Sequence, residues 1–401
     1  MLQIVSEILF WLIITLIAHT YIFHSVLLII LSKIKSPKEF LYYDNTSEQL
    51  PCISIVMSAF NEQKVIEQKI NSIFQSNYPT DKIELLVGSD NSSDSTPDIL
   101  LNLQKQYPQL KPFIFQERQG KIKVINKLIA QCSHNIIITT DANVMFHTNT
   151  IYELIKYFKD KNIGLVDSRI INTGKKKDGI SIQESFYISR EVKIKNIESL
   201  LWGTMIGPFG GCFAIRKELF KEVPDNFLVD DFYINMIVLL QDYYAINNIQ
   251  ALVFEDVSNN ASEEFRRKVR ISSGNFQNMF HFLELLVPVN NELKLINPVS
   301  LWFNYVSHKV LRWLTPFLII QIPFLLLVLS YQEIYRYLLI LYIISIIIPL
   351  TDILLRKFNV NITFFRFFTH FYNMNTALLV GFIKYLKGIK SSVWQPTKRF
   401  Q

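Results

Sequence analysis

The stretch at residues 136–146, IIITTDANVMF, decides the expected fold. Three isoleucines and two threonines favour a buried β-strand, and this strand runs directly into Asp141 and Asn143. Because side chains two positions apart on an extended chain point the same way, both should lie on one side of the strand's tip. Their oxygens suit Mg²⁺ or Mn²⁺, which usually complete their shell with substrate phosphates. Taken alone, the triplet favours the alternative of a strand followed by an Asx turn.

The N-terminal part of the chain predicts a membrane anchor. The sequence has 401 residues and is 50% hydrophobic, which is too apolar for one ordinary soluble domain. Residues 8–32 contain no Asp, Glu, Lys or Arg, and a membrane-spanning helix needs about 20 apolar residues. Lys33, Lys35 and Lys38 follow and indicate the cytoplasmic side. The alternative, a cleaved signal peptide, is disfavoured by the length and by the missing basic start.

A second apolar block lies near the C-terminus. Residues 313–332 and 337–351 predict two further spans, whereas 367–383 is weaker because it contains His370, Asn373 and Asn375. Basic residues around the first two stretches place the 331–336 loop outside the cell. The basic tail at 387–401 also indicates the cytoplasm, which conflicts with a third full span in this block. The sequence leaves open whether residues 367–383 cross the membrane or lie at its interface.

Charge and cysteine content restrict the classes of partner. The net charge of +7 concentrates near the expected membrane segments, where anionic lipid attracts Lys and Arg. No Arg-rich run with interleaved aromatic residues indicates nucleic acid. Cys52, Cys132 and Cys212 lie far apart without a C-x-x-C pair, as expected for buried thiols in a reducing compartment. We therefore expect a multi-pass protein of the inner cell membrane with its polar domain in the cytoplasm.

That polar domain is expected at residues 50–286, where β-rich runs alternate with helical patterns. This alternation predicts an α/β fold with a largely parallel sheet. The expected strands are residues 53–58, 83–87, 113–115, 136–140 and 164–171, with helices from near 61, 95, 122, 149, 181, 230 and 263. The basic loop at 175–177 is expected to be a solvated turn.

Polar residues follow four successive strands of this domain: Asn61-Glu62, Asp90 to Asp94, Gly120-Lys121, and Asp141 to Asn143. Open α/β sheets bind ligands beyond the carboxyl ends of their strands. Turn chemistry alone explains any one of these ends, but not carboxylates at three of them and a lysine at the other. Carboxylates can accept hydrogen bonds from a ribose or a base, and a lysine can neutralise phosphates, so the pattern predicts a nucleotide site.

The motifs at residues 57–96, 118–128 (RQGKIKVINKL) and 139–146 (TTDANVMF) resemble the nucleotide-sugar half of family 2 glycosyltransferases with the GT-A fold. The resemblance covers residues 52–282 and is strongest to the membrane-embedded branch with cellulose, hyaluronan and poly-N-acetylglucosamine synthases. It implies donor nucleotide binding by Ala59, Glu62, Asp90, Lys121 and Asp141. It also places Asp141 and Asn143 at the D-x-D metal position, where Asn143 departs from the pattern and binds a hard cation less strongly than a carboxylate.

The resemblance continues into an acceptor half. It implies that Gly210, Gly211 and Cys212 lie beside the acceptor sugar, although a Gly-rich turn into a strand is an ordinary alternative. Asp230 and Asp231 open a helix, where acidic residues stabilise the helix dipole. The resemblance gives this pair a second role, with Asp231 as the general base of an inverting transfer and Asp230 as its support.

A basic helix at residues 263–271 ends the site motifs. Arg266 and Arg270 are four apart and should share a face suited to a diphosphate, with Arg267 extending the positive stripe. A helix lying on anionic lipid is the alternative. Processive synthases carry a Q-x-x-R-W motif at this place. Here Arg267 stands at the Gln position, Arg270 keeps the Arg, and Ile271 stands at the Trp position. The absence of the Trp disfavours synthesis of long polymers.

Five segments are thus expected: an N-terminal transmembrane helix (1–34), a GT-A domain (50–286), an interfacial segment (287–312), C-terminal transmembrane helices (313–386) and a basic tail (387–401). The expected function is Mg²⁺- or Mn²⁺-dependent transfer from a UDP-sugar to a glycan or lipid-linked acceptor at the bilayer, in cell-surface polysaccharide synthesis. Partner proteins of a polysaccharide-export system fit this function. The alternatives are a polyprenyl-phosphate glycosyltransferase and a catalytically silent scaffold of a polysaccharide-secretion complex.

Overall fold

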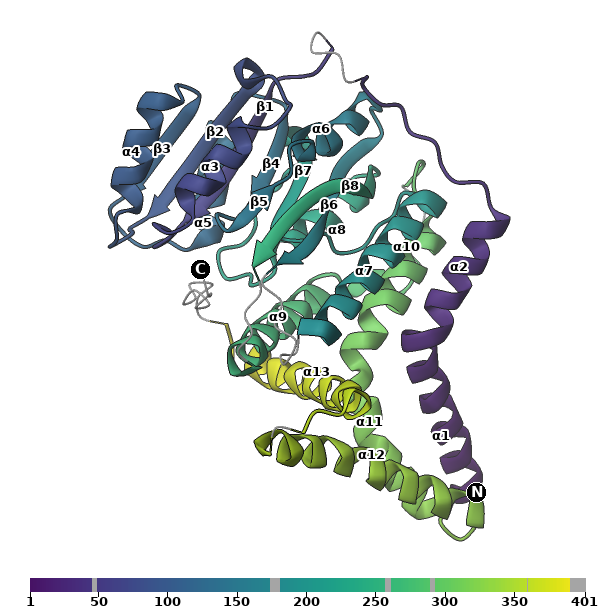
Figure 1. Ribbon diagram of the computed structural model, residues 1–401. Coiled ribbons are helices and arrows are strands. Elements are labelled where there is room, and N and C mark those ends of the chain that lie inside the picture. The colour runs from purple at the N-terminus through teal and green to yellow at the C-terminus, as the bar shows by residue number, and fades with distance from the viewer. Residues whose placement is uncertain (45–48, 174–180, 257–260, 289–292, 359, 390–401) are drawn as a thin grey trace.

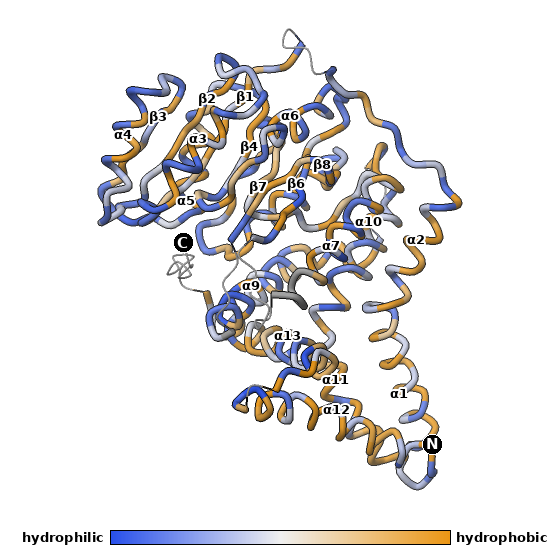
Figure 2. The backbone as a smooth tube through the Cα atoms, viewed as in Figure 1, coloured by the Kyte–Doolittle hydropathy of each residue, from blue (hydrophilic) through white to orange (hydrophobic). Residues whose placement is uncertain are grey.

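The computed structural model describes residues 1–44, 49–173, 181–256, 261–288, 293–358 and 360–389. An α/β domain lies at one end of the molecule, and long helices extend away from it (Figure 1). These helices are predominantly apolar, whereas the α/β domain mixes polar and apolar residues (Figure 2). The predicted basic loop at 175–177 and most of the basic tail lie outside the described residues.

The sheet has eight strands in the order β3-β2-β1-β4-β7-β6-β8-β5. The first four are mutually parallel, whereas β7 is antiparallel to both neighbours and β5 is antiparallel to β8. The sheet is therefore mixed, and the expected parallel arrangement holds for its first half. The strands are β1 (Ile53–Ala59), β2 (Ile83–Asp90), β3 (Leu110–Phe115), β4 (Ile136–Thr140), β5 (Val144–Phe146), β6 (Ile163–Thr173), β7 (Cys212–Arg216) and β8 (Tyr244–Asp256).

The helices of the α/β domain begin close to the predicted positions, with one exception. The first begins at Ile66 rather than near Asn61, because Asn61 has a φ of 54° and its side chain accepts a hydrogen bond from the backbone of Ser93. The helices are α3 (Ile66–Phe74), α4 (Thr96–Gln106), α5 (Lys121–Gln131), α6 (Thr150–Ile155), α7 (Ser181–Trp202), α8 (Asp230–Leu240) and α9 (Ala261–His281). Short helical turns are η2 (Thr80–Lys82), η3 (Lys156–Lys159), η4 (Lys217–Leu219) and η5 (Leu283–Leu286).

Three helical segments among the described residues are long and apolar enough to cross a membrane: Leu2–Ile34, Pro298–Leu329 and Glu333–Lys357. The first two each contain a π-helical turn where they meet, and His19 Nε2 lies 3.0 Å from Ser307 Oγ. The elements are α1 (Leu2–Ala18), η1 (His19–Phe23), α2 (His24–Ile34), α10 (Pro298–Asn304), η6 (Tyr305–Val310), α11 (Leu311–Leu329) and α12 (Glu333–Lys357). The predicted interfacial segment thus includes the start of the second candidate span.

The last helix, α13 (Thr363–Leu386), is not one of these candidates and packs along α9 of the α/β domain. Ser273 Oγ donates a hydrogen bond to the carbonyl of Gly381 at 3.0 Å. A Cβ on Gly381 would lie 2.4 Å from the Cβ of Ser272, so the two helices need a glycine at this contact. Since α13 contacts the α/β domain directly, the weak apolar stretch of the sequence lies at the domain's side of the molecule.

Candidate active site

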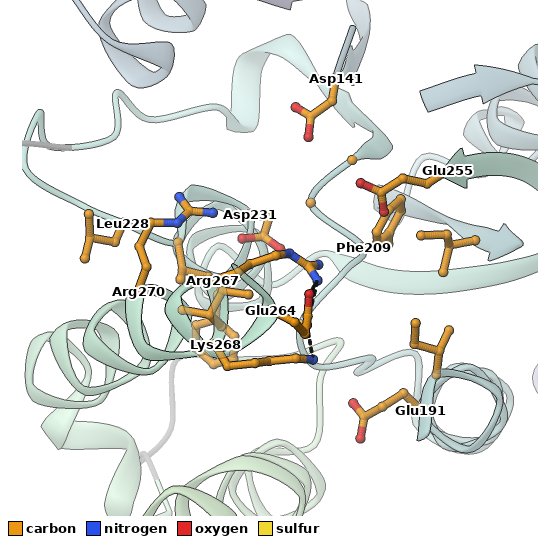
Figure 3. A pocket seen from close by; sticks show the side chains of 18 of the residues that line it. Asp141, Glu191, Phe209, Leu228, Asp231, Glu255, Glu264, Arg267, Lys268 and Arg270 are labelled. Carbon is orange, nitrogen blue, oxygen red and sulfur yellow. Dashed lines mark hydrogen bonds and ion pairs between the residues drawn. The ribbon is translucent and has the colours of Figure 1, made fainter. Parts of the chain in front are cut away.

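One cavity of about 1050 Å³ lies between the carboxyl ends of β1, β2 and β4 and the helices that face the membrane segments. Helices α7, α8 and α9 and the loop before β7 form its walls (Figure 3). Most of the predicted site residues line this cavity: Glu62, Asp90, Lys121, Asp141, Asn143, Gly210, Gly211, Asp230, Asp231, Arg267 and Arg270. The structure therefore brings together motifs that are more than two hundred positions apart in the sequence.

Two predicted site residues, Ala59 and Cys212, do not line the cavity. They are 1% and 0% exposed, respectively. Ser58 and Phe60 line the cavity instead of Ala59, because side chains alternate between the two faces of a strand. For the same reason, the side chain of Cys212 points away from the cavity that Gly211 borders. Burial raises the pKa of Cys212 to about 12, so its thiol stays neutral.

Lys121 joins the end of β4 to the start of α8. Its Nζ lies 2.8 Å from Oδ1 of Asp141 and 3.8 Å from Oδ2 of Asp230. Burial alone would lower the pKa of Lys121, but the two carboxylates raise it above its ordinary value. The ammonium group therefore stays charged at neutral pH. It lies where it can compensate either these carboxylates or the phosphates of a bound nucleotide.

Asp231 occupies the first turn of α8 and packs against the backbone of Gly210. A Cβ added to Gly210 would lie 2.8 Å from Oδ2 of Asp231. Burial raises the pKa of Asp231 to about 7, repulsion from Asp230 adds to this effect, and Lys121 opposes it. A carboxylate with a pKa near 7 can exchange protons at neutral pH, which is the property that a general base needs.

Asp90 has a structural role that the sequence did not reveal. Its two carboxylate oxygens accept hydrogen bonds from the backbone N–H groups of Gln119 at 2.6 Å and Gly120 at 2.9 Å. Gly120 has a φ of 90°, a conformation that favours glycine. Asp90 thus fixes the turn that carries Lys121, in addition to the contact with the nucleotide that was predicted for Asp90.

A buried network, also missed by the sequence reasoning, holds the glycine loop at residues 207–211. Asp167 Oδ1 accepts a hydrogen bond from the N–H of Phe209 at 2.7 Å, and Asp167 Oδ2 pairs with Lys195 at 2.5 Å. Asn247 donates a third hydrogen bond to Asp167 at 2.9 Å. Asp167 is fully buried, and an acidic residue inside an apolar strand was the available signal for this network. The network fixes the backbone on which Asp231 packs.

Arginines of α9 line the opposite wall of the cavity. Arg267 and Arg270 are directed into it, and Arg267 pairs with Glu264 at 3.1 Å (Figure 3). Arg266 is exposed and does not line the cavity, so the expected pairing of Arg266 with Arg270 on one face is replaced by Arg267 with Arg270. Burial lowers the pKa of Arg270, with repulsion from Arg267 adding to this effect.

The cavity continues toward the membrane helices and changes character there. Glu191 of α7 pairs with Arg312 at 2.5 Å and with Lys309 at 3.0 Å, and both cations belong to the second candidate span. Aromatic residues from η1, α7 and α13 also border this part of the cavity: Tyr21, Phe186, Tyr187, Phe367 and Phe371. This half can therefore accommodate a molecule with both anionic and apolar parts.

The oxygen donors at the end of β4 fit a divalent cation that shares its shell with phosphates. No group of three or more His, Cys, Asp or Glu side chains within the described part of the chain could hold a metal ion. Asp141 and Asn143 line the cavity, and Asn143 Nδ2 donates a hydrogen bond to Oε1 of Glu255 at 3.1 Å. Mg²⁺ and Mn²⁺ are commonly held by one or two carboxylates together with substrate phosphates.

Comparisons with known proteins find glycosyltransferases. Residues 54–224 match the family model described as glycosyl transferase family 2. The chain is 24% identical to the probable glycosyltransferase YdaM of Bacillus subtilis, over 64% of this chain and 63% of that protein. It is 30% identical to the beta-monoglucosyldiacylglycerol synthase of Trichormus variabilis, over 32% and 28% of the respective chains. It is 24% identical to a poly-beta-1,6-N-acetyl-D-glucosamine synthase of Staphylococcus epidermidis, over 57% and 55%.

These matches span less than two thirds of the length of each relative. A solved structure covers more of the chain. A mannosyltransferase from Pyrobaculum calidifontis, in complex with GDP-Man and Mn²⁺, superimposes with a TM-score of 0.67 over 94% of this chain and 99% of that one. At 20% sequence identity, this likeness shows that the two chains share a fold.

Proposed function

We propose, on the premise that this chain belongs to glycosyl transferase family 2 and has a GT-A-like fold, that it is a membrane-bound inverting glycosyltransferase. It takes a sugar from a UDP-sugar and transfers it to a glycan or lipid-linked acceptor at the bilayer, in the synthesis of cell-surface carbohydrate. The α/β domain faces the cytoplasm, and the three apolar segments anchor it in the inner cell membrane.

The observation that carries this proposal is the convergence of Asp141, Lys121 and Asp231 on one cavity. Lys121 reaches both Asp141 and Asp230, so the predicted donor site lies next to the residue that precedes the predicted base, Asp231. A catalytically silent scaffold would not need these charged side chains to converge on one cavity. The geometry therefore supports catalysis over the scaffold alternative.

The residues divide the reaction between them. Asp231 accepts the proton of the acceptor hydroxyl as its oxygen attacks the anomeric carbon from the face opposite the diphosphate. Lys121, Arg267 and Arg270 compensate the negative charge that develops on the departing nucleoside diphosphate. A divalent cation bound at Asp141 would supply further electrostatic stabilisation to the same leaving group. The transfer needs no covalent intermediate, since one displacement inverts the configuration.

The shape of the cavity favours a lipid-linked acceptor. Beyond Asp231 it is bordered by aromatic side chains of α7, α13 and the first membrane segment, where Tyr21 and Phe371 have ring centroids 5.3 Å apart. An apolar tail can lie along these helices while the hydroxyl group reaches Asp231. The similar proteins include enzymes named for each class of product: one is named as a glycolipid synthase and another as a polysaccharide synthase.

A polyprenyl-phosphate acceptor is the second candidate, and the basic residues of the membrane-side half favour it. Arg190, Lys309 and Arg312 all border the cavity there. Glu191 compensates part of this charge through Lys309 and Arg312. Arg190 donates hydrogen bonds to the Tyr21 carbonyl and to Ser25 Oγ, so it ties α7 to the first membrane segment. A lipid phosphate would then be the nucleophile in place of a hydroxyl group.

Product analysis tests the proposal. Membranes containing the protein are incubated with radiolabelled UDP-glucose or UDP-N-acetylglucosamine and Mn²⁺, and then extracted with organic solvent. Label in the organic phase that resists mild acid indicates a glycolipid, whereas acid-labile label indicates a glycosyl phosphate. Precipitable aqueous label indicates a polymer. Absence of transfer from every UDP-sugar would overturn the proposed activity.

A further inference from the structure

The second position of the D-x-D motif carries an amide, and the fold brings a carboxylate to it from another strand. Asn143 is 4% exposed, and its Nδ2 donates a hydrogen bond to Oε1 of Glu255 at 3.1 Å. Glu255 lies near the end of β8, where it is the register partner of Val144 of β5. It is directed into the same cavity as Asp141 (Figure 3). The amide thus orients an acidic group that lies 112 positions away in the sequence.

A neighbouring side chain independently indicates a ligand at this place. Asn172 of β6 is the register partner of Glu255 in a parallel pair, so both side chains lie on the same face of the sheet. Asn172 also lines the cavity and is 9% exposed, and its Oδ1 has no hydrogen-bond partner among the described residues. A buried amide oxygen without a partner is costly, and a bound cation would satisfy it.

The charge balance at Asp141 also calls for a second acid. Lys121 lies 2.8 Å from Asp141, so this carboxylate is already largely compensated. Asn143 adds an oxygen but no charge. Glu255 adds the negative charge that a divalent cation requires, and its carboxylate lies beside the side chain of Asn143, two positions along the chain from Asp141.

We propose that Glu255 supplies the second carboxylate of the cation site, together with Asp141, and that the amide oxygens of Asn143 and Asn172 face the same ion. This inference deepens the proposed function, on which it rests, because the cation would hold the diphosphate of the sugar donor. The carboxylate lost at Asn143 is thus replaced by one from β8. Strand β8 carries a direct metal ligand in addition to its structural role.

Direct Mn²⁺ binding tests the assignment without relying on turnover. The purified full-length protein is titrated with Mn²⁺, with and without UDP, and free Mn²⁺ is measured by electron paramagnetic resonance. Glu255→Gln should weaken Mn²⁺ binding by about tenfold or more. In that background, Asn143→Asp should restore most of the affinity, because it returns a carboxylate to the same place. Glu218→Gln, which removes an exposed acid outside the cavity, should bind Mn²⁺ like the wild type.

Unchanged Mn²⁺ affinity in Glu255→Gln, or no recovery on adding Asn143→Asp, would overturn the inference. If Glu255→Gln does not fold, the single variant Asn143→Asp tests the site. Its added carboxylate beside Glu255 should tighten Mn²⁺ binding severalfold. Unchanged Mn²⁺ binding in this variant would count against the site. An assay of sugar transfer by the wild type distinguishes a failure of the proposed function from a failure of the proposed role of Glu255. Transfer together with a negative Mn²⁺ result overturns only the role of Glu255, whereas absence of transfer overturns the proposed function.

Discussion

Gly210 lies so close to Asp231 that a Cβ on the glycine would be 2.8 Å from Oδ2 of the carboxylate. Asp231 therefore rests directly on backbone, and that backbone is held by Asp167 through the N–H of Phe209. The glycine loop and the start of α8 thus form one unit. A single methyl group added at Gly210 should therefore displace the proposed base, Asp231, although Gly210 itself carries no functional group.

Replacing Gly210 with alanine should lower kcat by about 10²-fold, since misplacement of a catalytic group by an ångström has an effect of this size. The fold should persist, because neighbouring side chains can move into the open cavity. Gly388→Ala is the control: nothing lies within 4 Å of its added Cβ, but its φ of 86° favours glycine, so this variant should lose some stability and keep its kcat. Equal kcat values for Gly210→Ala and wild type, measured as UDP release, would contradict the close packing of Asp231.

Activity should depend on pH through Asp231. The base acts only when deprotonated, and burial followed by repulsion from Asp230 raises its pKa to about 7. Therefore kcat/KM should fall tenfold per pH unit below about 7 and level off above it. An aspartate at its ordinary pKa of 3.8 would instead give a flat profile from pH 5 upward. Asp230→Asn removes a like charge and should move the midpoint of the profile to lower pH.

Glu191 should contribute to the stability of the junction between the α/β domain and the second membrane segment. Its side chain is 14% exposed and pairs with Lys309 and Arg312, which are 11% and 13% exposed. Glu191→Ala leaves two largely buried cations without this counter-ion, and breaking a fully buried pair costs about 3–5 kcal/mol, which is the upper limit here. A thermal melt in detergent or nanodiscs should show a clearly lower midpoint.

The control for Glu191 is an exposed ion pair. Glu333 and Arg336 pair at 3.4 Å with side chains 79% and 56% exposed, and such pairs are worth about 0–1 kcal/mol. Glu333→Ala should leave the midpoint nearly unchanged. Equal shifts for the two variants would mean that the Glu191 cluster does not hold the domain to the membrane helix.

Arg270 should bind the leaving diphosphate. It is directed into the cavity, and hydrogen bonds to charged groups are worth about 1.5–3 kcal/mol, so Arg270→Gln should weaken UDP binding by about tenfold or more (Figure 3). Arg266→Gln provides a matched control on the same helix, because Arg266 is exposed outside the cavity. Calorimetric titration with UDP and Mn²⁺ measures both variants. A larger loss of UDP affinity for Arg266→Gln than for Arg270→Gln would support the arrangement expected from the sequence, in which Arg266 faces the diphosphate.

The elements near β4 could be predicted because local patterns determine them. Short apolar runs ending in polar residues located β1 to β4, and the match to known motifs located Asp141, Lys121 and Asp231. Strands β5 and β8 were not expected, and both they and the antiparallel pairing of β7 depend on contacts between distant strands, which local patterns do not encode. Glu255 was missed for this reason, although a carboxylate at a strand end was the same signal that identified Asp141.

Three residues expected at the site, Ala59, Cys212 and Arg266, do not line the cavity, and the reason is different. Ala59 and Cys212 were placed in the site by motif position, whereas strand alternation turns their side chains into the core. Arg266 was chosen by helical spacing, but the rotation of α9 relative to the cavity is set by its packing on α13. Spacing along a helix predicts which residues share a face, not which face the protein uses.

Nucleoside diphosphate release by purified protein with Mg²⁺ or Mn²⁺ tests the role of Asp231 directly, when wild type and Asp231→Asn are compared across candidate sugar donors. The wild type should release UDP from at least one UDP-sugar in the presence of acceptor lipids. The rate of release should fall by about 10² to 10⁴ in the variant, the size of a general-base contribution. Release that is undiminished in Asp231→Asn would contradict the central claim that these carboxylates form one catalytic site.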